Sequence, residues 1–130
     1  MPTLTAEQSR TIAKSYADLA AALSAYRFGH WTALTKAQRA EIESHEWTLL
    51  TYSSNMTSHA IGLAVADLSD VVRGIAKAAK ALSAAARKVT GIKRVLGVAT
   101  AAVALGAAVA SGHPIAIGEA ISRALGAAGR

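Results

Sequence analysis

The chain has 130 residues, two prolines and no cysteine, and this length is typical of one domain. Without cysteine, the sequence excludes disulfides, thiolate metal sites and cysteine nucleophiles. Hydrophobic residues make up 52% of the chain and charged residues 17%, and 32 residues are Ala, the best helix former. We therefore expect an all-α protein, an elongated helical bundle of four to five helices that forms a single domain over 1–130 and ends in an apolar helical hairpin.

The net charge of +6 is unevenly distributed along the chain. Residues 1–70 have a net charge of −2, whereas residues 71–130 contain nine Lys and Arg and a single acid, Glu119. A basic half predicts an anionic partner. That half has no Phe, Trp, Tyr, Asn or Gln, which nucleic-acid readers combine with basic residues. We therefore expect an anionic lipid membrane rather than nucleic acid; a solvated cationic face is the alternative.

The first two predicted helices begin at matching polar motifs. Thr5 with Gln8, and Thr35 with Gln38, have the spacing of a capping box. The first helix is expected over 6–27 from its apolar stripe, followed by a turn with Gly29 in the left-handed conformation. In the second helix, the poor helix formers at 52–55 (Tyr, Ser, Ser, Asn) predict a break or kink.

Aromatic residues gather around the turn between these two helices, namely Tyr26, Phe28 and Trp31, with Trp47 further on. Two interpretations are open. The rings either anchor the two helices in a common core, or lie at a bilayer interface, where amphipathic rings are favoured.

A long apolar stripe with heptad rhythm follows from residue 61 to residue 89. It predicts one helix and completes an amphipathic body over 6–89. Its seam is expected to support self-assembly into a homo-oligomer through Leu68, Val72, Ile75, Leu82 and Val89.

The last third of the chain changes character after Lys93 and Arg94, because residues 95–112 carry no charge. As a helix these residues span about 27 Å, slightly less than a hydrocarbon core. Ser111, Gly112 and His113 with Pro114 predict a turn, and Pro114 suits the first position of a final helix at 114–126. The segment 92–126 thus predicts an apolar hairpin balanced between water and lipid; the alternative is the buried core hairpin of a soluble bundle. Its expected membrane-contacting residues are Val95, Leu96, Val98, Val103, Leu105, Val109, Ile115, Ile117 and Ile121, and its expected headgroup-binding residues are Lys93, Arg94 and Arg123.

This layout resembles the α-helical pore-forming toxins of the cytolysin-A and tripartite haemolysin type. The resemblance lies in GIKRVLGVATAAVALGAAVASGHPIAIGEAISRAL at 91–125, which follows IAKAAKALSAAARKV at 75–89. It implies a protein that refolds, self-assembles and perforates a bilayer. A soluble homo-oligomeric scaffold, with the hairpin as its assembly core, is the alternative function.

The sequence offers no motif for catalysis. His45, Glu46 and Trp47 begin like a zinc-protease helix, but Leu49 stands where the second His is needed. Phosphate-binding loops, nucleophile elbows and calcium loops are missing from the sequence. We therefore expect no enzymatic activity, no cofactor, no metal and no small-molecule substrate. Because no Sec signal is visible, we expect synthesis in the cytoplasm, with membrane association or secretion by another route.

Overall fold

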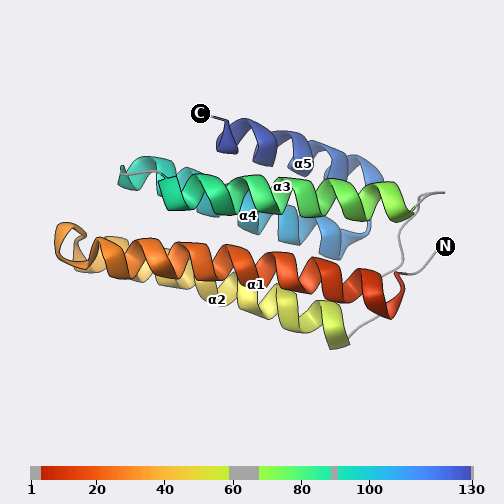
Figure 1. The fold of residues 1–130 in the computed structure, drawn as a ribbon, viewed down its shortest axis with the longest axis horizontal. Coiled ribbons are helices and arrows are strands. Elements are labelled where there is room, and N and C mark those ends of the chain that lie inside the picture. The colour runs from red at the N-terminus through yellow and green to blue at the C-terminus, as the bar shows by residue number, and fades with distance from the viewer. Residues whose placement is uncertain (1–3, 59–67, 89–90, 130) are drawn as a thin grey trace.

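The computed structural model describes residues 4–58, 68–88 and 91–129, and these residues form helices and no strand. The elements are α1 (Ala6–Gly29), a 3₁₀ turn (Trp31–Ala33), α2 (Lys36–Ser58), α3 (Leu68–Lys88), α4 (Ile92–Ser111) and α5 (Pro114–Ala128). The helices lie side by side along one long axis. Helices α1, α3 and α5 begin at one end of the molecule, and α2 and α4 begin at the other (Figure 1). The predicted all-α bundle, with five helices, is confirmed.

Both predicted capping boxes are present. The backbone N–H of Gln8 donates to Thr5 Oγ1 at 3.0 Å, and Gln8 Oε1 accepts from the Thr5 N–H at 2.9 Å. Thr35 and Gln38 make the same two bonds at 3.1 and 2.9 Å. Each box satisfies two donors that a helix start leaves unpaired. The starts of α1 and α2 are therefore fixed by local sequence.

The predicted left-handed turn at Gly29 is wrong. Helix α1 includes Gly29, and helical hydrogen bonding continues to His30, whose N–H donates to the carbonyl of Tyr26 at 3.0 Å. The His30 ring stacks on Tyr26 at 4.1 Å and extends this end of the helix. Among the described residues, the positive φ belongs to Gly112, which ends α4 at 71°. The predicted turn there is confirmed, with Pro114 opening α5.

The predicted break at residues 52–55 is also wrong, because α2 runs without interruption to Ser58. Ser53 Oγ donates to the carbonyl of Ala13 at 2.8 Å. The Tyr52 ring lies 6.0 Å from the Tyr16 ring and covers the backbone at Gly106. These contacts with distant parts of the chain override the weak local helix propensity.

The core is built from the apolar stripes of all five helices. Helix α1 packs on α2 and α3, α4 packs on α2, α3 and α5, and α5 also packs on α3. Among the predicted seam residues, Val72, Ile75 and Leu82 are buried within this bundle. Leu68 opens α3, whereas Val89 and the start of the stripe at 61–67 lie outside the described residues.

Candidate functional site

The predicted membrane-contacting residues of the hairpin mostly face the interior of the bundle. Val95, Val98, Leu105, Val109 and Ile117 are each at most 2% exposed. Leu96, Val103 and Ile121 are half-buried, and Ile115 alone in this set is exposed, at 78%. In this conformation the strongest apolar side chains contact other helices, so contact with lipid requires the hairpin to leave the bundle.

The outer face of α4 is uncharged beyond its first turn. Lys93 and Arg94 are exposed at its start, and the exposed positions that follow are Gly97, Thr100, Ala107, Ala110 and Ser111. A surface helix of a soluble protein ordinarily carries charged and polar residues on its outer face. Among the described residues, α4 is the one helix long and apolar enough to cross a membrane, and 39% of its most apolar stretch is buried. A core helix of a soluble protein passes the same test.

A shallow groove of about 480 Å³ separates α4 from α5 on this outer surface. Arg123, one of the predicted headgroup-binding residues, lies at its edge and is exposed. The remaining residues that line it are small: Gly97, Thr100, Ala101, Ala104, Ser122, Gly126 and Ala127. A surface of such residues lets another helix approach closely.

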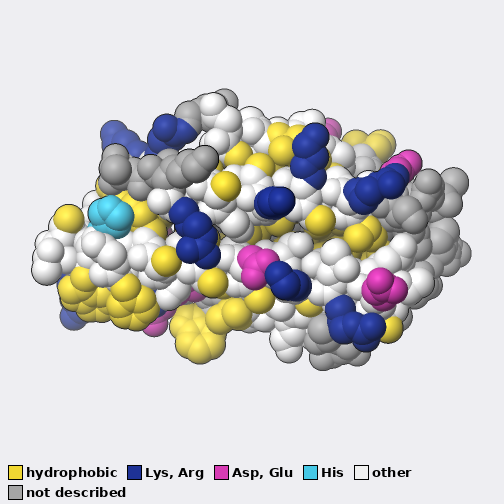
Figure 2. All heavy atoms as spheres, viewed as in Figure 1, with side chains coloured by type: hydrophobic (Ala, Val, Ile, Leu, Met, Phe, Trp, Pro, Cys, Tyr) yellow, Lys and Arg dark blue, Asp and Glu magenta, His cyan; other side chains and the backbone are white. Residues whose placement is uncertain are grey.

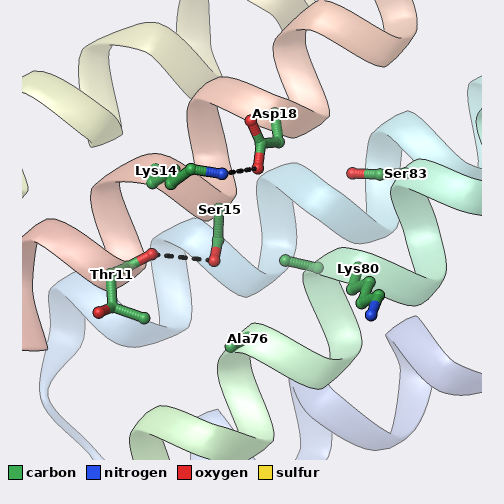
Figure 3. Close-up of a pocket in the computed structure, with 8 residues that line it drawn as sticks. Thr11, Lys14, Ser15, Asp18, Ala76, Lys80 and Ser83 are labelled. Carbon is green, nitrogen blue, oxygen red and sulfur yellow. Dashed lines mark hydrogen bonds and ion pairs between the residues drawn. The ribbon is translucent and has the colours of Figure 1, made fainter.

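A second groove, of about 410 Å³, lies between α1 and α3 (Figure 3). Lys14 reaches Asp18 on the same helix at 3.1 Å, and both side chains are more than half exposed. Across the groove, the Ser83 hydroxyl points towards α1 without a hydrogen-bond partner (Figure 3). Asp18 is the one carboxylate among the residues that line the groove, and it is paired with Lys14 and exposed to solvent. No residue that lines the groove is a His. This arrangement does not activate Ser83 as a nucleophile, which needs an adjacent base.

The turn between α1 and α2 is bordered by exposed aromatic rings. Phe28 is 63% exposed and Trp31 44%, whereas Tyr26 is buried; Trp47, which lies further along α2, is 64% exposed. The Phe28 and Trp31 rings stack at 5.9 Å with an angle of 9° between their planes. The core-anchor interpretation therefore holds for Tyr26 and is wrong for the other three rings.

A buried ion pair joins α1 to α2 behind these rings, and no sequence pattern predicted it. Arg27 donates from Nε to Glu46 Oε2 at 2.7 Å and from Nη2 to Glu46 Oε1 at 3.0 Å. Both side chains are about nine-tenths buried, and Glu43 lies 3.6 Å from Arg27. The hydrogen bond to Glu46 raises the pKa of Arg27. Partners 19 residues apart on two helices leave no periodic pattern to detect.

Tyr16 places another polar group deep in the core, where the residue is 1% exposed. Its hydroxyl has no hydrogen-bond partner, and burial, followed by the nearby Tyr52, raises its pKa. Within the described part of the chain, no three His, Asp or Glu side chains lie close enough to hold a metal ion.

Comparisons of the chain with protein-family models, curated proteins and solved structures found no match.

Proposed function

We propose that this protein is a membrane-active, self-assembling helical protein of the pore-forming type, whose α4–α5 hairpin enters or lies on a bilayer. One observation carries the proposal. The outer face of α4 has no charge from residue 95 to residue 111, although it faces water in the folded monomer. Such a face is suited to a less polar environment than water, either lipid or another helix.

The transfer is conditional, because the folded bundle already keeps the apolar residues of the hairpin out of water. Val95, Val98, Leu105 and Val109 are buried against other helices. A hydrocarbon core keeps the same side chains from water, and strong apolar residues each favour insertion by about 0.3–0.6 kcal/mol. When the hairpin leaves the bundle, its apolar side chains stay out of water, so the main free-energy cost is the loss of packing contacts with the other helices. Exposed Lys93, Arg94 and Arg123 then lie at the headgroup level of an anionic leaflet.

A charge placed on the outer face of α4 tests this function. Ala107 is exposed, so Ala107→Asp leaves the bundle folded but puts a carboxylate inside the span, at a cost of about 3 kcal/mol for insertion. We expect dye leakage from anionic vesicles to be lost. Ala21→Asp, at an exposed position in α1, is the matched control and retains leakage. Equal leakage from both variants removes α4 from the mechanism.

The groove between α4 and α5 supports a second candidate, a soluble homo-oligomeric scaffold. Its small residues admit a helix of another copy without any lipid. Sedimentation separates the two functions: a scaffold assembles in buffer and stays in the supernatant when vesicles are added. Gly97→Leu, which fills the groove, dissociates such an assembly.

A further inference from the structure

The end of the bundle where α2 and α4 begin carries both exposed aromatic rings and clustered positive charge. The 3₁₀ turn (Trp31–Ala33) lies at this end, where α3 also ends and α4 begins (Figure 1). The end of α1 contacts the end of α3 here. A small pocket is lined by Tyr26 of α1 and its C-cap His30, together with Ala86 and Arg87 of α3. Figure 2 shows hydrophobic, basic and His side chains together at this end.

The aromatic rings are held in place by buried or paired groups beneath them. Arg39 donates to the carbonyls of Trp31 and Leu34, each at 2.7 Å, while its guanidinium lies 4.5 Å from the centre of the Trp31 ring. Arg27, fixed by Glu46, lies 4.5 Å from the centre of the Phe28 ring. Leu34 anchors the turn in the core at 6% exposure. The rings are thus ordered before any partner binds, which lowers the entropic cost of binding.

The charge at this end is strongly positive. Basic residues occupy the terminal turns of three helices here: Lys36 and Arg39 in α2, Arg87 in α3, and Lys93 and Arg94 in α4. The acids of α2 follow further along, and two of them, Glu43 and Glu46, are engaged by Arg27. At the opposite end, acidic residues lie in the first turns of two helices, Glu7 in α1 and Asp70 in α3. The molecule therefore has a charge asymmetry along its long axis.

We propose that this end, made of Phe28, Trp31, Arg87, Lys93 and Arg94 and here called the docking end, is the surface that first binds an anionic bilayer. Lipid is the partner that fits both parts. Stacked rings suit the headgroup region, where Trp is favoured, and each basic residue near an anionic leaflet adds attraction. The inference rests on the proposed function for its partner, but docking and insertion use different residues and can fail separately.

Docking at this end also leads into insertion. Lys93 and Arg94 form the first turn of α4, so the docking end brings the start of the uncharged helix to the headgroups. The order of events is binding through the ring and charge cluster, followed by release of the hairpin.

Flotation with vesicles of phosphatidylcholine and phosphatidylserine tests the charge. Lys93→Glu with Arg94→Glu places acids in the first turn of α4, where the helix dipole stabilises them. We expect vesicle binding to fall by more than about tenfold. Arg10→Glu with Arg73→Glu changes the net charge equally at the opposite end and leaves binding within about threefold of the unmodified chain. Equal losses in the two double variants overturn the proposal.

The rings are tested in the same way. Phe28→Ser with Trp31→Ser lowers vesicle binding by about tenfold or more, whereas Trp47→Ser with Leu50→Ser, on the side of α2, leaves it unchanged. Circular dichroism verifies that each variant is folded. Unchanged binding without Phe28 and Trp31 overturns the proposal.

The two tryptophans report the site directly. In an Ala107→Asp background, which blocks insertion but not docking, Trp47→Phe leaves Trp31 as the sole Trp, and Trp31→Phe leaves Trp47. Brominated lipid quenches Trp31 and spares Trp47 if the docking end binds; the reverse pattern overturns the proposal.

The docking proposal and the proposed function can fail separately. If the docking-end variants still cause leakage, docking at this end is contradicted and the proposed function stands. If the unmodified chain binds vesicles through the docking end but causes no leakage, the proposed function is contradicted and docking stands. Binding of a short DNA duplex without any flotation identifies a nucleic acid as the partner and also overturns the proposal.

Discussion

Helices α1 and α2 are held in register by polar contacts as well as apolar ones, whereas α4 and α5 are held by the shape of small side chains. Capping boxes begin α1 and α2, and the Arg27–Glu46 pair joins them. The N-cap residues of α4 and α5 are Gly91 and His113, and neither caps its helix with a side-chain hydrogen bond. Their packing is apolar and involves many Ala and Gly residues.

This difference matters because polar contacts specify one arrangement, while apolar contacts can be replaced. Separating α1 from α2 breaks the two charge-assisted hydrogen bonds between Arg27 and Glu46, and in a bilayer the freed charges would not be solvated as they are in water. Separating the hairpin from the bundle exposes mainly apolar surface, which lipid or a second copy covers again. The first hairpin is therefore expected to stay intact in any rearrangement, and the second is the part that can move.

The largest expected effect is on the free energy of unfolding, when an Asp on the buried face of α4 is compared with an Asp on its exposed face. Leu105 is fully buried, so Leu105→Asp creates a cavity and buries a charge, and lowers the free energy of unfolding by about 4 kcal/mol or more. Ala107→Asp, two residues away on the exposed face, costs less than about 1 kcal/mol. Urea unfolding followed by circular dichroism measures both. Similar losses contradict the described orientation of α4.

The buried ion pair gives the next largest effect. Glu46→Ala leaves Arg27 charged and unpaired in the core and should cost about 3–5 kcal/mol. Replacing both residues with Leu restores most of this stability, because no charge is then buried. Lys14→Ala, which removes an exposed pair with Asp18, serves as the control and costs less than about 1 kcal/mol. A double-mutant cycle with no coupling between Arg27 and Glu46 contradicts the pairing.

Local sequence predicted the features that local physics determines. The capping boxes at Thr5 and Thr35, the turn at Gly112 and the start of α5 at Pro114 each depend on residues within a few positions. The inward stripes also follow from helical periodicity, as the burial of Ile75 and Leu82 shows.

Most of the failed predictions concern contacts with other parts of the chain; the exception is Gly29, where the helix continues through a local bond from the His30 N–H to the Tyr26 carbonyl. The continuity of α2 at Ser53 depends on the carbonyl of Ala13, forty residues away. The position of Trp31 depends on Arg39, whose guanidinium donates to the carbonyls of Trp31 and Leu34 and lies over the Trp31 ring. Neither contact has a periodic signature. The sequence left open whether the aromatic rings lie in the core, and three of them, Phe28, Trp31 and Trp47, lie on the surface.

The Tyr52 ring of α2 packs on Gly106 of α4, and this contact between the two hairpins is expected to tolerate little change at Gly106. A Cβ there would lie 2.4 Å from Cδ2 and 2.7 Å from Cε2 of Tyr52, so Gly106→Ala forces that ring to move and costs about 1–3 kcal/mol. Gly97 has open space around it, and Gly97→Ala should stabilise α4 by up to about 1 kcal/mol. Thermal unfolding compares the two. In a Tyr52→Leu background the penalty at Gly106 shrinks, and a penalty that persists unchanged contradicts the ring contact.

The smallest effect addresses the missing cap of α4. Gly91 has the extended conformation of an N-cap, with φ −89° and ψ 134°, and open space where a Cβ would lie. Gly91→Ser supplies an oxygen for the unpaired backbone N–H groups of the first turn and should raise the free energy of unfolding by a few tenths of a kcal/mol. Thr35→Ala, which removes an existing cap from α2, should lower it by about 1 kcal/mol. If Gly91→Ser stabilises the hairpin in the folded bundle but not in the membrane, it should also slow vesicle leakage slightly, by less than about twofold. A gain in stability without slower leakage indicates that the start of α4 keeps its helical conformation throughout insertion.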